Sequence, residues 1–227
     1  MDYKKYQGRI FKEADEGYRD FVLKGIITEW PLIGVRIPKC REIAKEVSAG
    51  KYGTVDDFLN YKPVSFEEVM IRGFVVANLP YAEMKEKIFD FVQLIDNWEI
   101  CDCFCSTLKS VKKNKDDFLE IIDKLLLKEE FFARVGLVCF LEYYLVPEYL
   151  TVVFDRILEI KNRDEHYVKM GVAWLLATSF AKFPEETMAF FKVAELPKWT
   201  HNRTIAKSCE SYRVDRDLME ELKKLRV

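Results

Sequence analysis

The fold of this chain is indicated by the stretch Glu130-Phe131-Phe132-Ala133-Arg134-Val135-Gly136-Leu137-Val138-Cys139-Phe140-Leu141, which recurs along the sequence. Two further copies are Glu68-Val69-Met70-Ile71-Arg72-Gly73-Phe74-Val75-Val76-Ala77-Asn78-Leu79 and Glu165-His166-Tyr167-Val168-Lys169-Met170-Gly171-Val172-Ala173-Trp174-Leu175-Leu176. Each copy has an acidic residue, a basic residue four positions later, a glycine close behind and a strongly apolar end. Residues 98–108 and 200–209 occupy matching places. A period of roughly 30–35 residues is typical of helical-repeat proteins.

Each repeat is predicted to contain two helices. The partner helices are expected at residues 85–94, 117–126, 148–160 and 184–193, because apolar residues recur there at three- and four-residue spacing. No alternating strand pattern of useful length is present. The predicted helix starts are the capping box of Ser65 and Glu68, the N-caps Asn97 and Thr200, and the first-turn prolines Pro38 and Pro184.

We therefore predict an all-α fold, a curved α-solenoid of helical hairpins that forms a single domain over residues 1–227. Residues 1–61 are expected to form two or three capping helices, and residues 62–227 about five helix-pair repeats. Gly73, Gly136 and Gly171 fall inside predicted helices, where each glycine costs about 1 kcal/mol relative to alanine. Close approach of neighbouring helices would justify that cost.

Composition narrows the classes of function. No apolar run reaches transmembrane length and the first residues lack an apolar signal region, so we expect a soluble, cytoplasmic protein. The six cysteines are interpreted as reduced thiols, which agrees with that compartment. The net charge of −2 argues against non-specific coating of DNA, because most nucleic-acid-binding domains are basic. A local basic face remains compatible with this balance, since the field depends on where charges lie.

Charged residues occupy equivalent places in five of the predicted helices. These residues are Arg72, Asp102, Arg134, Lys169 and Arg203. Equivalent positions of a solenoid line up along one surface, so the four cations could hold consecutive phosphates of a DNA backbone. The alternative is an ordinary helix-stabilising pair, in which each base interacts with the glutamate four residues earlier. The pairs concerned are Glu68–Arg72, Glu130–Arg134 and Glu165–Lys169.

Asp102 is the acidic residue among these five equivalent positions. Its opposite charge makes it the best candidate for a catalytic residue. Trp98 precedes it by four residues, so the two side chains share a helix face. A carboxylate among cations is suited to stabilising positive charge on a bound molecule. The alternatives are a core tryptophan and an exposed or capping aspartate. Trp174, about one turn after Lys169, either borders the same surface or lies in the core.

The sequence Cys101-Asp102-Cys103-Phe104-Cys105 raises the alternative of a metalloenzyme. On a helix Cys101 and Cys105 share a face while Cys103 points away, whereas zinc requires four converging ligands. We therefore expect packing cysteines and no metal. A cysteine nucleophile would need a histidine partner, and neither His166 nor His201 pairs with a cysteine in any recognised motif.

Five segments together resemble the AlkD family of DNA alkylation-repair glycosylases. They are Pro31-Leu32-Ile33-Gly34-Val35-Arg36-Ile37-Pro38, Asn97-Trp98-Glu99-Ile100-Cys101-Asp102, Arg134, residues 167–174, and Thr200-His201-Asn202-Arg203. The resemblance covers most of the chain, in order and with similar spacing, and the Trp-x-x-x-Asp element is its most specific part. The family fold is a stack of HEAT-like repeats that forms a concave DNA-binding surface.

The resemblance implies a DNA glycosylase that hydrolyses the N-glycosidic bond of cationic N3- and N7-alkylated purines in double-stranded DNA, without base flipping. It implies that Asp102 is the catalytic carboxylate, that Trp98 and Trp174 contact the lesion's deoxyribose and backbone, and that Arg134 contacts a phosphate. Arg203 matches the family's last repeat. No metal or cofactor is implied, and a monomer is expected.

The chain departs from the family pattern at Asn97, where the best-known members have a second tryptophan, and in its acidic net charge. The alternative function is a non-catalytic repeat scaffold that binds structured DNA or a protein partner through the same surface.

Overall fold

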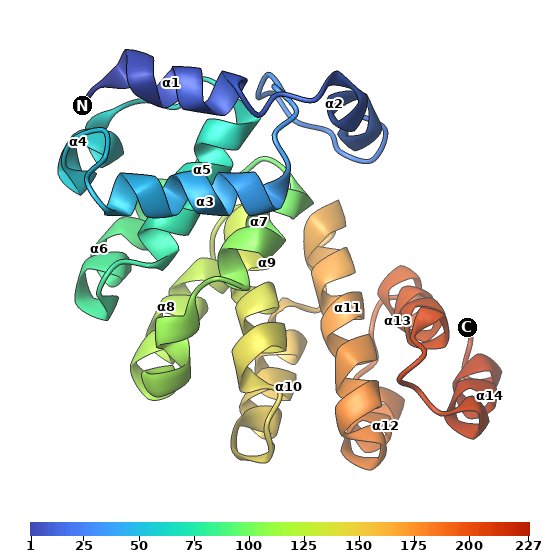
Figure 1. Ribbon diagram of the computed structural model, residues 1–227. Helices are drawn as coiled ribbons and strands as arrows, with labels where there is room; N and C mark the ends of the chain where they lie inside the picture. The colour runs from blue at the N-terminus through green and yellow to red at the C-terminus, as the bar shows by residue number, and fades with distance from the viewer. The chain divides into compact units, whose positions relative to one another are not determined.

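The computed structural model describes residues 1–227 and contains fourteen α-helices and no β-strand (Figure 1). The predicted all-α class is confirmed. The only bridge pairing is an isolated one between Lys51 and Gly53. Contacts divide the chain into two compact units, residues 1–110 (unit 1) and residues 111–227 (unit 2). None of the helices combines the length and the apolar composition that crossing a bilayer requires.

Unit 1 is built on three helices that pack in the order α3, α5, α7. Its helices are α1 (Tyr3–Phe11), α2 (Glu16–Val22), α3 (Ile37–Ser48), α4 (Val55–Asn60), α5 (Phe66–Ala77), α6 (Tyr81–Val92) and α7 (Trp98–Cys105). Helix α6 packs on α5, while α1 and α4 pack on α3. Four helices precede Tyr61, and one of them, α3, is part of this stack.

Unit 2 is built on three helices that pack in succession, each with a partner helix. Its elements are α8 (Lys115–Leu126), α9 (Glu130–Cys139), the π-helical turn η2 (Phe140–Tyr144), the 3₁₀ turn η3 (Pro147–Tyr149), α10 (Leu150–Ile160), α11 (His166–Lys182), α12 (Pro184–Val193), α13 (Lys198–Glu210) and α14 (Arg216–Lys224). A 3₁₀ turn, η1 (Lys109–Lys113), precedes α8. Helices α9, α11 and α13 pack in succession, and α8, α12 and α14 pack on α9, α11 and α13 respectively (Figure 1).

Side-chain contacts in unit 2 recur at a sequence separation of 33 residues. Arg156 on α10 donates from Nε and Nη2 to the two carboxylate oxygens of Asp123 on α8, at 2.7 and 3.0 Å. Arg203 Nε on α13 lies 3.4 Å from Met170 Sδ on α11. Since equivalent helices of successive repeats are in contact at this spacing, the period predicted from the sequence is confirmed.

Two predicted N-caps form hydrogen bonds at helix starts. Asn97 accepts from the Ile100 amide at 3.0 Å, as predicted. Ser65 accepts from the Glu68 amide at 3.3 Å, but the Glu68 carboxylate accepts from the Val64 amide at 2.8 Å. Only one of the two hydrogen bonds of the predicted capping box is therefore formed. The Glu68 carboxylate binds the amide of Val64 instead of the amide of the cap residue, Ser65.

The predicted N-cap Thr200 is wrong. Helix α13 begins at Lys198, directly after Pro197, and Thr200 is buried within its first turn. An X-Pro-Lys sequence can start a helix without a side-chain cap, because the proline fixes φ near the value that helix entry needs. Pro38 and Pro184 both lie in first turns, as predicted.

The predicted reason for the helical glycines is confirmed by their neighbours. A Cβ atom on Gly73 would lie 2.5 Å from the ring of Phe91 on α6, and one on Gly171 would lie 2.9 Å from Leu137 on α9. A Cβ atom on Gly136 would lie 3.1 Å from Leu126 on α8, a tight contact that a small shift of Leu126 would relieve. Contacts under about 3 Å require displacement of a buried neighbour, so these positions favour glycine on packing grounds.

Gly73→Ala is expected to lower the free energy of unfolding by about 1–3 kcal/mol, because the buried Phe91 ring would have to move. Alanine's helix propensity opposes this loss by at most about 1 kcal/mol. Gly8→Ala in α1 is the matched control, since no other atom lies within 4 Å of its added Cβ. The control is expected to raise stability by about 0.4–1 kcal/mol in urea unfolding. Equal stabilisation by both variants would contradict the packing explanation.

Candidate active site

The start of α7 is tied to the loop that follows α2. Asp96 accepts hydrogen bonds from the Thr28 hydroxyl at 2.8 Å and from the Glu29 amide at 2.6 Å. Asn97, which is fully buried, donates from its side-chain amide to Asp96 at 2.7 Å while it caps α7. The first turn of α7 is therefore held in place by a network within unit 1.

Trp98 is the first residue of α7, and its indole is 38% exposed. The indole Nε1 donates to the Gly25 carbonyl at 3.1 Å. This hydrogen bond fixes the orientation of the indole ring. The exposed part of the ring is available to a ligand. The core interpretation of Trp98 is therefore wrong, since buried core tryptophans do not expose this much surface.

Asp102 lies one turn after Trp98 on the same helix and is half-buried. Its carboxylate adds to the negative potential at the neighbouring Cys103 thiol. Arg41 on α3 contributes a positive charge to the same surroundings, and its Nη1 donates to the Thr107 hydroxyl at 2.7 Å. The sequence reasoning missed Arg41, because α3 and α7 are far apart in the chain and no motif links them.

The three cysteines of α7 behave as packing residues. Cys101 and Cys105 are fully buried and Cys103 is half-buried. Burial is the main cause that raises the pKa of the Cys103 thiol to about 11, and the nearby carboxylates add to it while Arg41 opposes it. A thiol with this pKa is protonated at neutral pH and is a poor nucleophile. No group of three or more His, Cys, Asp or Glu side chains is arranged to hold an ion.

Arg72 has a structural environment within unit 1. Its guanidinium donates to the carbonyls of Leu59 at 2.9 Å, Phe58 at 3.2 Å and Tyr61, all at the end of α4. A cation satisfies the unpaired carbonyls and the negative dipole end of a helix. Burial lowers the pKa of Arg72 from its usual value. These contacts favour anchoring of α4 over the predicted contact with a phosphate.

Arg134 is 5% exposed, much less than the prediction of a phosphate contact requires. Its Nη1 donates to the Tyr167 carbonyl at 3.3 Å, and its guanidinium carbon lies 5.6 Å from the centre of the Tyr167 ring. Glu130, one turn earlier, accepts from the Tyr167 amide at 2.6 Å. Both side chains of this Glu–Arg pair therefore bind the start of α11, where a carboxylate also complements the helix dipole.

Lys169 and Arg203 lie on α11 and α13, two helices that pack against each other. Lys169 Nζ pairs with Asp164 at 2.7 Å, while Glu165 pairs with Arg163. The alternative of an i, i+4 pair between Glu165 and Lys169 is therefore wrong. Arg203 is partly exposed and lies 3.8 Å from Glu210. Two cations on adjacent helices are suited to contacts with a polyanion.

Trp174 also lies on α11 and is half-buried. Its backbone carbonyl accepts from the Thr178 hydroxyl at 2.9 Å. Partial burial of a tryptophan allows contact with both the core and a ligand. Trp174 therefore has neither the full burial of a core residue nor the exposure of Trp98.

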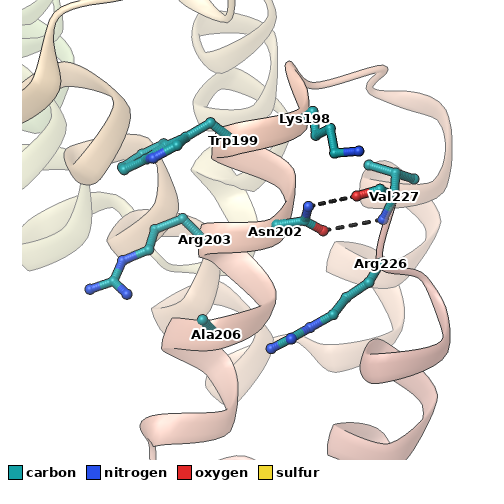
Figure 2. Close-up of a pocket in the computed structure, with 7 residues that line it drawn as sticks. All are labelled: Lys198, Trp199, Asn202, Arg203, Ala206, Arg226 and Val227. Atoms are coloured by element: carbon teal, nitrogen blue, oxygen red, sulfur yellow. Dashed lines mark hydrogen bonds between the residues drawn. The ribbon is translucent and has the colours of Figure 1, made fainter.

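A pocket beside Arg203 was missed by the sequence reasoning. It lies on α13 and is lined by Trp199, Lys198 and Arg226 in addition to Arg203 (Figure 2). The Lys169 ammonium lies 5.1 Å from the centre of the Trp199 ring, which is 40% exposed. The sequence signal for this pocket is weak, because Trp199 directly precedes Thr200, the predicted N-cap.

The sequence matches the family described as DNA alkylation repair enzyme over residues 9–208. This match includes both units and every residue of the predicted site. No curated protein matches the chain. Because the family match spans well over half of its length, the chain belongs to the DNA alkylation repair enzyme family.

Proposed function

We propose that this protein is a DNA glycosylase that hydrolyses the N-glycosidic bond of cationic N3- and N7-alkylated purines in double-stranded DNA. The observation that carries the proposal is the position of Asp102 on α7. It lies half-buried, one turn after the exposed and oriented Trp98, in a chain of a DNA alkylation repair family.

The chemistry needs one well-placed anion. An N-alkylated purine carries a positive charge, so it leaves with the electrons of the C1′–N bond and becomes neutral without being protonated first. Positive charge then develops on the deoxyribose as an oxocarbenium-like ion, and a fixed carboxylate stabilises that ion. Water adds to C1′ and releases a proton to solvent. In this proposal Asp102 supplies the anion and positions the water, and the lesion stays in the duplex.

Trp98 is proposed to contact the lesion's deoxyribose. Its indole face attracts positive charge through the ring quadrupole, an effect worth about 0.5–2 kcal/mol. Within unit 2, Lys169, Arg203 and Trp174 are proposed to contact the DNA backbone. Arg134 is proposed to act indirectly, by holding the start of α11.

Trp98→Ala is expected to slow release of 7-methylguanine by about 10-fold, which corresponds to loss of about 1.4 kcal/mol of cation–π stabilisation. Trp98→Phe is the matched control. It keeps an aromatic face and loses only the hydrogen bond to the Gly25 carbonyl, so we expect a loss of about 3-fold or less. Single-turnover base release under protein excess measures both. Equal rates for Trp98→Ala and the parent protein would exclude this role.

A non-catalytic DNA- or protein-binding scaffold is the second candidate. Two observations favour it: the net charge of −2, and the engagement of Arg72 and Arg134 within their own units. Such a scaffold would bind undamaged bent or branched DNA, or a protein partner, and would release no base.

A base-release assay on methylated duplex DNA separates the two candidates. The glycosylase predicts free 7-methylguanine or 3-methyladenine above the level from protein-free DNA. Binding of the duplex with no released base would contradict the glycosylase and support the scaffold.

A further inference from the structure

The pocket on α13 is the feature of unit 2 that the proposed function leaves unexplained. It is open to solvent, has a volume of about 700 Å³, and lies between α13 and the segment that follows α14 (Figure 2). Volumes of this size accommodate ligands of nucleotide dimensions.

The segment of residues 225–227 is fixed against α13 by three hydrogen bonds. The Asn202 side chain donates to the Val227 carbonyl at 2.7 Å and accepts from the Val227 amide at 3.2 Å, as the dashed lines in Figure 2 show. His201 Nε2 donates to the Leu225 carbonyl at 2.8 Å. Arg226, between these anchors, is thereby held at the pocket. A preorganised backbone loses less entropy when the segment binds a ligand.

The pocket is strongly cationic. Lys198 and Arg226 are exposed and form no ion pair, and Figure 2 shows Arg203 on the same side of α13 as Trp199, with Lys198 on the other side. Glu210 lies 3.8 Å from Arg203 but only 2.7 Å from Lys207, with which it forms a closer ion pair. Unpaired cations at a preformed surface are suited to phosphate oxygens, and guanidinium groups bind them in a bidentate manner.

Trp199 adds an aromatic surface to these cations. Its indole is 40% exposed, and it lines the pocket beside Arg203 (Figure 2). On the side of α11, the Lys169 ammonium lies 5.1 Å from the centre of this ring and the His166 ring contacts it edge-on, so a base would stack on the exposed remainder of the indole. Aromatic side chains that alternate with cations bind single-stranded nucleic acid, because bases stack on the rings while phosphates bind the cations.

We propose that this pocket binds an unpaired nucleotide of single-stranded DNA, with its base stacked on Trp199 and its phosphates held by Arg203, Arg226 and Lys198. A single strand is favoured over a duplex, because both faces of a base in a duplex are covered by its neighbours and cannot stack on an indole. DNA is the polymer expected for a chain of a DNA repair family. The site goes beyond the proposed glycosylase, and its binding does not depend on base release.

The test is fluorescence anisotropy of a labelled oligothymidine of about 10 nucleotides, a length within the range that such sites cover. The full chain is expected to bind it, and a blunt duplex of the same length is measured beside it as the comparison. Trp199→Ala is expected to weaken binding by about 10-fold, whereas Trp199→Phe is expected to stay within about 3-fold of the parent, because it keeps a ring for stacking.

Two charge variants test the phosphate contacts. Arg226→Gln and Lys198→Gln are each expected to reduce the slope of log affinity against log salt by about 0.7, the value for one phosphate contact with a single strand. Lys182→Gln, an exposed lysine at the end of α11 and outside the pocket, is the matched control and is expected to leave the slope unchanged. Thermal unfolding of each variant establishes that it is folded.

Three results would overturn the proposal. They are unchanged oligothymidine binding by Trp199→Ala, an equal loss for oligothymidine and blunt duplex, and an equal change of salt slope in Lys182→Gln. Base release from methylated duplex is measured on the same variants. Release that persists in Trp199→Ala while oligothymidine binding is lost supports the proposal, and absence of release from the parent protein affects only the glycosylase.

Discussion

Asp102→Asn is expected to slow the release of 7-methylguanine from alkylated duplex DNA by roughly 100- to 1,000-fold, the range seen when one preorganised electrostatic group is removed from an active site. The substitution keeps the size and shape of the side chain and removes its charge. Binding of the duplex is expected to be kept or slightly strengthened, because an anion that repels phosphates is lost.

The expected magnitude follows from where the charge develops. The lesion is cationic before the reaction, and the transition state moves that positive charge from the purine to the deoxyribose. A carboxylate near C1′ therefore interacts more strongly with the transition state than with the bound substrate, which is the condition for catalysis. An uncharged amide provides little of this difference, so the loss is expected in the rate constant and not in the affinity.

Asp90→Asn is the matched control for this variant. Asp90 is an exposed aspartate of α6, also in unit 1, and its substitution removes the same charge at a different place. It is expected to leave the rate of base release within about 2-fold, because exposed charges beyond a Debye length are screened. An equal loss in Asp90→Asn and Asp102→Asn would assign the effect to net charge alone.

Glu67→Ala is expected to lower the free energy of unfolding by about 3 kcal/mol or more, because it leaves several buried donors without a partner. Glu67 is 1% exposed and lies in the first turn of α5. Its carboxylate accepts from the amides of Ile33 at 3.0 Å, Gly34 at 2.7 Å and Val35 at 3.1 Å. These amides belong to the segment of residues 31–38, which carries part of the family resemblance.

The control for this prediction is Glu86→Ala, an exposed glutamate of α6. Substitutions at such positions usually change stability by less than about 0.5 kcal/mol. The midpoint of urea unfolding measures both variants, provided that the slope with denaturant is unchanged. Glu67→Gln is expected to fall between them, since it keeps one acceptor oxygen. A midpoint for Glu67→Ala equal to that of the control would contradict the bonding described for this loop.

Much of the fold could be predicted from the sequence, because packing determines the repeat. Gly73 and Gly171 recur where neighbouring side chains approach too closely for a Cβ atom, so their spacing reports the helical stack directly. Asn97 could be identified as an N-cap because its side chain directly satisfies a free amide of α7. Thr200 could not be distinguished from a cap, since threonine is also common inside a first turn.

The contacts of the basic residues Arg72 and Arg134 were predicted less well than the helices that carry them. A glutamate and a base four residues apart indicate a helix face, but they do not determine where the long side chain ends. Arg72 reaches the last carbonyls of α4, and Arg134 reaches the Tyr167 carbonyl on α11. Both targets belong to other helices, and their distance from the arginine depends on packing that one sequence does not reveal.

The pocket on α13 also depends on packing that the sequence does not reveal. It requires Trp199 of α13 and Arg226, which follows α14, to line the same pocket. The hydrogen bonds between Asn202 and Val227 bring them together, and nothing in the local pattern indicates this pairing.

The most direct test is the single-turnover rate of 7-methylguanine release from one methylated duplex, measured for the parent protein, for Asp102→Asn and for DNA alone. The glycosylase predicts a parent rate well above that of DNA alone and an Asp102→Asn rate close to it. A parent rate no faster than the spontaneous loss, or equal rates for the parent and Asp102→Asn, would contradict the assignment of Asp102 as the catalytic carboxylate.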